Sequence, residues 1–442
     1  MKLTAFHAAD GDCCLIESRD SPPRRLLVDG GRTASYEANT RDTLGAIRDD
    51  GGKLDVICVS HIDDDHISGI VRLIEDEVAW RQFEFLKATK PSTKPPSIAR
   101  PPKIGEVWHN GLFRLVGDET GHAVEPVLGT VAAILAGSPV DKHRTLAAQL
   151  DDVITGEMSS MELTRRLSPQ QLGIPLNPRS NGRLLKRSAS GPTKPFEDVA
   201  LGSLRIFLLG PSQDDIDKLR EKWQEFLDES KAELAKLHQQ MLREEERLGA
   251  LSPRIVANPM LDEALGEGLS SVTEANLASL MLLVEEGTKK VLMTGDGVSS
   301  EIIEGLKRHK KLDASGRIHA DVLKVQHHGA KANVDDQFVR TVTADNYVFC
   351  GNGAQTNPEL EVVEAFATAR LKGFDGGSPI GPNRPFKFWF TSGPATPDKT
   401  KTKARQKHMK AVKALVTKLR QGHTAQMQAA TFLTDGSFTI NL

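Results

Sequence analysis

Apolar runs of strand length, bounded by turn residues, recur in two parts of the 442-residue chain. The runs of the first part lie at 3–8, 13–18, 25–31, 54–61 and 103–111. Those of the second part lie at 203–211, 277–286, 289–296, 321–329 and 346–352. Such runs predict strands, and the polar stretch 39–51 predicts a helix between two of them. The pattern therefore predicts an α/β fold, and several strands end in polar clusters, where α/β sheets place their sites.

Three segments interrupt this alternation. Residues 85–103 and 117–200 are rich in Pro, Ser, Lys and Arg without a sustained apolar period, which predicts loops or insertions. Residues 213–250 carry apolar side chains on one face at helical spacing, so they predict a long amphipathic helix. The interpretations left open for this helix are packing on its own domain, a homodimer contact and contact with a regulatory partner.

The composition is that of a folded protein of the cytosol. Hydrophobic residues make up 39% of the chain and the formal charge is −2, so a large core is expected and a polycation is excluded. No stretch approaches the roughly 18 apolar residues of a membrane span, and the start of the chain lacks a signal peptide's apolar core. We therefore expect a cytoplasmic location without membrane contact. The four cysteines lack CxxC spacing, which predicts reduced, buried thiols.

Two histidines and three aspartates crowd into six positions directly after the apolar run 54–59. They are His61, Asp63, Asp64, Asp65 and His66. Like charges at the end of a buried strand repel one another, and a bound cation replaces this repulsion by coordination. The alternative is an acidic turn in which Asp64 or Asp65 caps the next helix, but capping does not account for the histidines. The segment therefore predicts a metal site.

The cluster resembles the HxHxDH signature of the metallo-β-lactamase fold, with Asp63 in the place of the second histidine. The HxDxDH variant is similar to the hydrolase domains of ComEC-type DNA-uptake proteins. Further motifs follow in the family's order, namely a GD turn at 11–12, a DGG loop at 29–31, a hairpin at 276–296 and HHG at 327–329. The resemblance implies a four-layer αβ/βα sandwich, a single domain over 1–442 with the insertions above and a basic C-terminal segment at 384–423.

The resemblance also implies two divalent metal ions, zinc or manganese. By position in the motif, His61 and Asp63 would ligate the first ion, and Asp65 and His66 the second. A further ligand for the first ion has no clear counterpart in the sequence. His109 is the candidate, because it ends a strand between the first and later motifs.

The later motifs complete the implied site. Asp296 would bridge the two ions and hold the attacking hydroxide, so the catalytic assignment goes to Asp65 and Asp296. Either His327 or His328 would complete the shell of the second ion, and the sequence leaves the choice open. Asp29 is expected to be structural, tying the DGG loop behind the metals.

The donor set and one departure from the family bear on the chemistry. Two neighbouring cations lower the pKa of a water between them and neutralise an ester undergoing attack. Asp63 in the place of a histidine gives the first site a hard oxygen ligand instead of a nitrogen. This ligand favours manganese over zinc, and a phosphodiester over a β-lactam as substrate. Asn357 lies where relatives often carry histidine, so it is a candidate for substrate contact but not for acid catalysis.

The segment 384–423 has many lysines and arginines against a single acid, Asp398. Lys403, Lys407 and Lys410 would lie on one helical face and could bind a phosphate backbone, while nearby aromatics stack on bases. An ordinary solvated helix with core aromatics fits the same residues.

Three functions follow from the sequence. The first is a metal-dependent phosphodiesterase or nuclease, with nucleic acid as substrate. The second is a small-molecule hydrolase of lactone, thioester or cyclic nucleotide type, in which the insertions would enclose a pocket. The third is a regulatory module with a vestigial metal site, in which the 213–250 helix mediates assembly.

Overall fold

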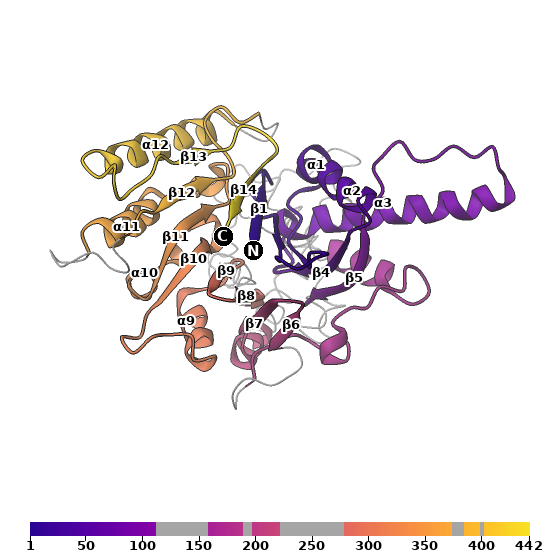
Figure 1. Ribbon diagram of the computed structural model, residues 1–442, viewed down its shortest axis with the longest axis horizontal. Helices are drawn as coiled ribbons and strands as arrows, with labels where there is room; N and C mark the ends of the chain where they lie inside the picture. Colours follow the sequence, from indigo (N-terminus) through magenta and orange to yellow (C-terminus); the bar gives the residue numbers. More distant parts are fainter. Residues whose placement is uncertain (112–157, 189–196, 222–277, 374–383, 398–401) are drawn as a thin grey trace, which may run out of the picture.

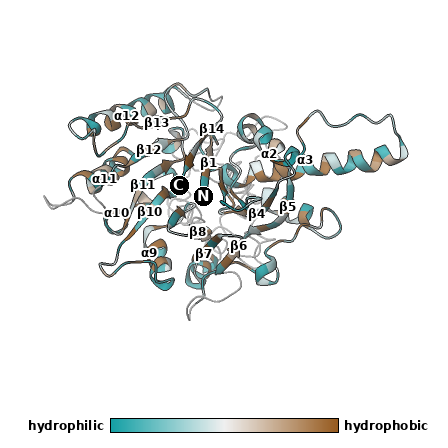
Figure 2. Ribbon diagram, in the orientation of Figure 1, coloured by the Kyte–Doolittle hydropathy of each residue, from teal (hydrophilic) through white to brown (hydrophobic). Residues whose placement is uncertain are grey.

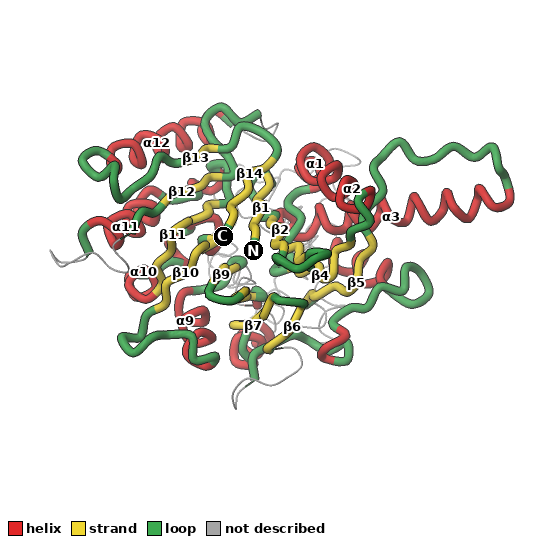
Figure 3. The backbone as a smooth tube through the Cα atoms, in the orientation of Figure 1, coloured by secondary structure: helices red, strands yellow, loops and turns green. Residues whose placement is uncertain are grey.

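A computed structural model places two β-sheets face to face with helices on both outer faces (Figures 1 and 3). The residues that it describes are 1–111, 158–188, 197–221, 278–373, 384–397 and 402–442. Both termini lie near the middle of the molecule in Figure 1, where the two sheets meet.

The first sheet is built mainly from the N-terminal part of the chain. Its strands run in the order β14-β1-β2-β3-β4-β5. They are β1 (Lys2–Phe6), β2 (Cys14–Glu17), β3 (Arg25–Val28), β4 (Lys53–Val59), β5 (Lys103–His109) and β14 (Ser437–Asn441). β14 pairs antiparallel with β1, so the last strand of the chain completes the N-terminal sheet. The strands β3, β4 and β5 are mutually parallel, which brings the carboxyl ends of β3 and β4 to the same sheet edge.

The second sheet has the order β13-β12-β11-β10-β9-β8-β7-β6. Its strands are β6 (Asp198–Leu201), β7 (Leu204–Gly210), β8 (Met281–Glu286), β9 (Lys289–Met293), β10 (Ile318–Lys324), β11 (Val342–Phe349), β12 (Lys387–Phe390) and β13 (Thr431–Phe432). From β9 onward the neighbours are parallel, so loops after β9, β10 and β11 share one edge. Gly287 turns the chain between β8 and β9 with φ of +60°, a conformation that glycine adopts without strain.

Helices cover the outer face of each sheet. Beside the first sheet lie α1 (Thr33–Ser35), the π-helix η1 (Tyr36–Thr40), α2 (Arg41–Asp49) and α3 (Asp64–Thr89). Beside the second lie α9 (Ser299–Arg308), α10 (Asp336–Thr341), α11 (Leu360–Leu371) and α12 (Lys403–Arg420). Short 3-10 turns are η2 (Pro178–Ser180), η4 (Gln326–Gly329), η5 (Lys331–Asn333) and η6 (Ala354–Thr356).

In the part of the chain that the structure describes, three apolar cores separate the layers. The inner core joins the sheets through residues such as Ile16, Val56, Leu282 and Val322, all with 0% exposure. One outer core packs α2 and α3 on the first sheet, and the other packs α9 to α12 on the second. Strand residues in the cores are brown in Figure 2, whereas the outward helix faces are largely teal. Four layers result because each sheet is apolar on both faces.

The predicted strands form, and a few elements differ from expectation. α3 continues to Thr89, so residues 85–89 are helical and not part of a loop. Four strands lie outside the apolar runs from which strands are predicted, namely the short β6, β12 and β13, and β14. The four cysteines are buried free thiols, as expected.

Two predicted segments fall largely outside the described residues. Of the predicted helix 213–250, only 213–221 is described, and it is helical. Most of 117–200 is also outside, although 158–167 is helical. Among the described helices, none combines the length and apolar character that crossing a bilayer requires.

The aromatics of the basic C-terminal segment belong to the core. Phe386, Phe388 and Phe390 are at most 1% exposed. Phe390 stacks on Phe349 with ring centroids 5.0 Å apart, inside the core beneath α11 and α12. These rings therefore cannot stack on nucleic-acid bases.

Candidate metal centre

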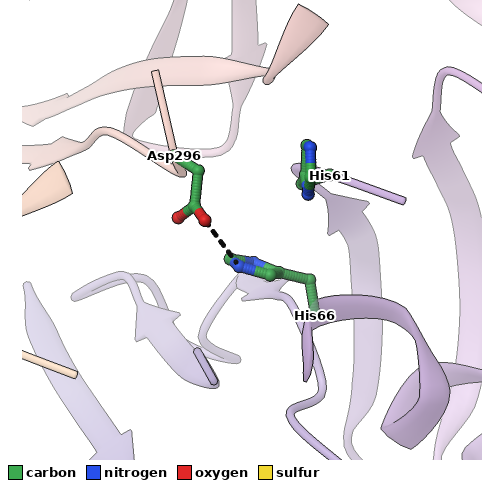
Figure 4. Close-up of side chains that lie close together, drawn as sticks. All are labelled: His61, His66 and Asp296. Atoms are coloured by element: carbon green, nitrogen blue, oxygen red, sulfur yellow. Dashed lines mark ion pairs between the residues drawn. The ribbon is translucent and has the colours of Figure 1, made fainter. Parts of the chain in front are cut away.

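The facing edges of the two sheets bring His61, His66 and Asp296 together (Figure 4). His61 follows β4, His66 lies in the first turn of α3, and Asp296 follows β9 of the opposite sheet. The Nε2 atom of His66 is 3.3 Å from Oδ2 of Asp296. The side chains from the two sheets thus converge on one point, with exposures of 4%, 0% and 2% for the three residues.

A second group shares His66 and adds residues from α3 and from the turn after β10. It consists of Asp65, His66 and His328, whose ligand atoms all lie within 4.8 Å of one another. His328 Nε2 is 3.1 Å from Asp65 Oδ2 and 3.6 Å from Asp296 Oδ2. Asp296 therefore belongs to the first group and also lies close to His328 of the second, and its role as a bridging ligand stays a prediction.

The geometry distinguishes the two histidines of the HHG turn. His328 belongs to two of the groups that could hold an ion, whereas His327 belongs to none of those found among the described residues. His327 instead contacts Asn333 Oδ1 through Nδ1 at 2.7 Å, and its Nε2 is 3.8 Å from Asp296 Oδ2. Both residues have left-handed backbone conformations, with φ of 44° and 55°. Strain of this kind is characteristic of functional turns. We therefore favour His328 as the ligand.

Asp12 was not predicted as a site residue, yet it lies inside the cluster. Its Oδ1 is 3.2 Å from His328 Nδ1, and its other oxygen forms an ion pair with Lys324. Asp12 also belongs to groups with Asp296 and His328, and with Asp29 and His66. The GD turn at 11–12 could have indicated Asp12 as a site residue. An acid in a motif loop that follows the carboxyl end of a strand is a candidate metal ligand.

Lys324 is a fully buried cation at the base of the cluster. Its ammonium lies between Asp12 and Asp296, 3.7 Å from Asp296 Oδ1, and donates to the carbonyl of Gly295 at 3.0 Å. Burial acts to lower its pKa, but the two carboxylates outweigh burial and raise the pKa above the ordinary value. The lysine is therefore a permanent positive charge beneath the site.

The DGG loop holds the first turn of α3 from behind. Asp29 accepts hydrogen bonds from the backbone N–H and the hydroxyl of Ser60 at 2.7 and 2.6 Å, and its Oδ2 is 3.1 Å from His66 Nδ1. This is the structural role expected of Asp29. The loop and helix touch closely, since a Cβ at Gly69 would lie 2.0 Å from the carbonyl oxygen of Gly30. Only glycine allows this approach.

Charge and burial shift the pKa values of the cluster in opposite directions. Burial lowers the pKa of His61 to about 4. Burial, followed by the charge of Asp65, raises the pKa of Asp63 to about 7. For His66 burial also acts to lower the pKa, but Asp296 and other carboxylates raise it well above its ordinary value. The site thus concentrates negative charge in a space largely shielded from water, which attracts cations.

The donor atoms fit a divalent metal. Several buried ligand-type atoms in the cluster have no hydrogen-bond partner, namely His61 Nε2, His66 Nε2, Asp63 Oδ1, Asp12 Oδ1 and Asp296 Oδ1. Buried polar atoms are nearly always satisfied, and an ion is a common reason for such exceptions. Imidazole nitrogens and carboxylate oxygens within a few ångströms form the donor set of zinc and manganese sites.

An open pocket of about 350 Å³ leads to this cluster. Asp63, Asp65, Asp296 and His328 line its inner part, and Asn357 lies in its wall, as expected of a substrate-contacting residue. Arg32 and Arg405 also line the pocket, although the sequence analysis did not single out either. The site is therefore accessible to a small ligand or to part of a larger one.

Two other predicted sets lie elsewhere. His109 is buried at the end of β5, where its Nε2 is 2.8 Å from the hydroxyl of Ser160, and it belongs to none of the ion-holding groups found among the described residues. Its role as a ligand stays a prediction. Lys403, Lys407 and Lys410 are exposed on α12 and do not line the pocket, so their contact with nucleic acid also stays a prediction.

Comparison with known proteins agrees with this geometry. Residues 10–131 match the model of the metallo-beta-lactamase superfamily, a stretch that contains Asp12 and the 61–66 cluster. The chain has the metallo-β-lactamase fold. The superfamily consists mostly of metal-dependent hydrolases, and the clustered acids and histidines of this chain are able to bind metal. No curated protein matches the chain.

The contact behind His66 leads to a testable expectation. Replacing Asp29 by alanine removes the acceptor that orients the His66 ring and the β4–α3 turn. Loss of such outer partners typically lowers metal affinity by about 10- to 100-fold. Titration with Zn²⁺ or Mn²⁺ should show this loss, whereas Asp42→Ala on the outer face of α2 should bind metal as the parent does.

Proposed function

We propose that the protein is a metal-dependent phosphodiesterase that acts on nucleic acid, with two divalent ions in the centre described above. The observation that carries the proposal is the number of carboxylates in the cluster, since the groups of described residues that could hold an ion contain four aspartates, Asp12, Asp29, Asp65 and Asp296, and three histidines. Asp12, Asp63, Asp65 and Asp296 all lie in or beside the cluster. Oxygen-rich sites favour hard cations such as Mn²⁺, and these cations suit the anionic oxygens of a phosphodiester.

The chain's own residues divide the work in this proposal. His61 and Asp63 would hold one ion, Asp65, His66 and His328 the other, and Asp296 would lie between them. When bound, the ions supply a water of lowered pKa and neutralise charge on the ester oxygens. Asp29 keeps His66 oriented, and Lys324 fixes Asp12 and Asp296 from beneath.

The basic helix α12 extends the proposal to long substrates. Arg405, in its first turn, lines the pocket, and Lys403, Lys407 and Lys410 are exposed on the same helix. A strand leaving the pocket along α12 would meet these lysines, whose charges favour a phosphate backbone. The exposed face alone also fits an ordinary solvated helix.

The direct test is a hydrolysis screen on protein stripped of metal and reloaded. Bis-p-nitrophenyl phosphate and single-stranded DNA or RNA should be cleaved after addition of Mn²⁺ or Zn²⁺, and chelation should abolish cleavage. A β-lactam should not be hydrolysed at a comparable rate. Rapid turnover of a lactone or thioester with no phosphodiester cleavage would support the small-molecule hydrolase instead. Normal metal binding with no hydrolysis of any substrate class would support the regulatory interpretation.

A further inference from the structure

The lining of the pocket contains two guanidinium groups that converge on one carboxylate. Arg32 follows the DGG loop of the first sheet, and Arg405 comes from α12 beside the second sheet. Arg32 Nε donates to Asp10 Oδ1 at 2.6 Å, and Arg405 Nη1 is 3.6 Å from Asp10 Oδ2. Asp10 thereby holds two arginines from distant parts of the chain at the rim of the same pocket.

Further contacts hold the side chain of Arg32 and the backbone of Arg405. Arg32 also donates to Asp64 Oδ2 at 2.7 Å, which ties it to the first turn of α3. The backbone of Arg405 lies against the loop after β11, where a Cβ at Gly353 would come within 2.7 Å of its carbonyl oxygen. Gly353 has φ of +93°, so glycine is required there for its conformation as well. A side chain that is held like that of Arg32 loses little freedom on binding an anion.

The lining of the pocket therefore contains two chemically different sets of side chains. One set consists of carboxylates and imidazoles that could hold metal ions, and the other consists of Arg32, Arg405 and the amides of Asn352 and Asn357, with Asp10 between the two guanidinium groups. Guanidinium groups match the oxygens of phosphate in geometry and charge. The volume of about 350 Å³ suits one ester at the metals and one neighbouring group at the arginines.

We propose that Arg32 and Arg405 form a phosphate subsite that binds the phosphoryl group next to the scissile ester. The inference rests on the proposed phosphodiesterase function and names its substrate class, a nucleotide strand with at least one phosphate beyond the one that is cleaved. Arg405 is assigned as the specificity-determining residue, because it comes from α12 beside the opposite sheet and lines the pocket together with Arg32.

The test compares three dinucleotides on metal-loaded protein. These are thymidylyl-thymidine without a terminal phosphate, and the same molecule with a phosphate at the 5′ or at the 3′ end. One phosphorylated form should be cleaved with kcat/KM at least about tenfold above the plain dinucleotide, as expected for a charge-assisted contact. In Arg405→Gln this ratio should fall towards one, chiefly through KM, and Arg405→Lys should keep part of it.

A matched control and a binding measurement complete the design. Lys418→Gln removes the same charge from an exposed position of α12 and should keep the parent's ratio. Calorimetric titration with thymidine 3′,5′-bisphosphate should show an affinity loss of about tenfold or more in Arg405→Gln but not in Lys418→Gln.

The outcomes separate the two proposals. A parent enzyme that cleaves all three dinucleotides equally well would overturn the subsite, and so would equal bisphosphate affinity in Arg405→Gln. If no diester is cleaved at any metal loading, the phosphodiesterase proposal fails, and the inference that rests on it fails with it. A KM effect of Arg405→Gln on a carboxylate-bearing β-lactam, without a phosphate preference, would also overturn the subsite.

Discussion

Asp296→Ala should remove metal-dependent hydrolysis and most metal binding while leaving the fold intact. Asp296 lies 3.3 Å from His66 Nε2 and 3.6 Å from His328 Nε2. Among the carboxylates of the described residues, it is the only one that shares groups with His61, His66 and His328. Even the loss of an outer partner costs about 10- to 100-fold in affinity or activity. Loss of this carboxylate should therefore cost more than about 100-fold in each.

The measurement combines metal analysis, hydrolysis of bis-p-nitrophenyl phosphate and thermal unfolding. A ligand that binds the native state raises Tm, so Mn²⁺ or Zn²⁺ should raise the Tm of the parent but hardly that of Asp296→Ala. Asp336→Ala, which removes an exposed carboxylate from the start of α10, should behave like the parent. Full activity and a normal Tm rise in Asp296→Ala would contradict a centre shared by the two groups.

Of the single substitutions proposed here, Lys324→Met should cause the largest loss in the free energy of unfolding. Methionine has a similar length, so the change removes a charge with little change in packing. Lys324 is fully buried between Asp12 and Asp296, and removing one partner of such a buried pair typically costs about 3–5 kcal/mol in the free energy of unfolding. Urea unfolding of the chelator-treated protein should show a lower midpoint with an unchanged slope.

A second substitution distinguishes charge from packing. Asp12→Asn combined with Lys324→Met removes both members of the ion pair, so most of the lost stability should return. Addition of metal should also restore part of the stability of Lys324→Met, since cations replace the missing positive charge near Asp296. A double variant as unstable as Lys324→Met alone would show that the loss arises from packing.

The sequence by itself determined most of the scaffold and the centre of the site. Apolar runs of strand length followed by polar clusters predicted the α/β layers. Such patterns are local, so they can be read from the sequence without knowing the tertiary contacts. The crowding of His61, Asp63, Asp65 and His66 predicted a cation site, because no arrangement of these charges at a buried strand end is favourable without one. The assignment of Asp296 and the HHG turn to the metal site came from the order of the motifs along the chain. The structure brings His61, His66 and Asp296 into one group, and Asp65 and His66 into another with His328.

The tertiary structure alone decided the residues that have no local signal. Asp12 and Lys324 are more than 300 positions apart and meet only because the end of β10 and the β1–β2 turn, which belong to different sheets, lie at facing edges of the sandwich. Arg32 and Arg405 are likewise far apart in the sequence, and the fold brings both into contact with Asp10 at one pocket. Lysines and arginines are common on surfaces, so their type says little until the fold shows what they face. The choice of His328 over His327 likewise depended on the tertiary structure. The two residues are adjacent in the sequence and both have left-handed backbone conformations, and the sequence does not show which of the two rings faces the other ligands.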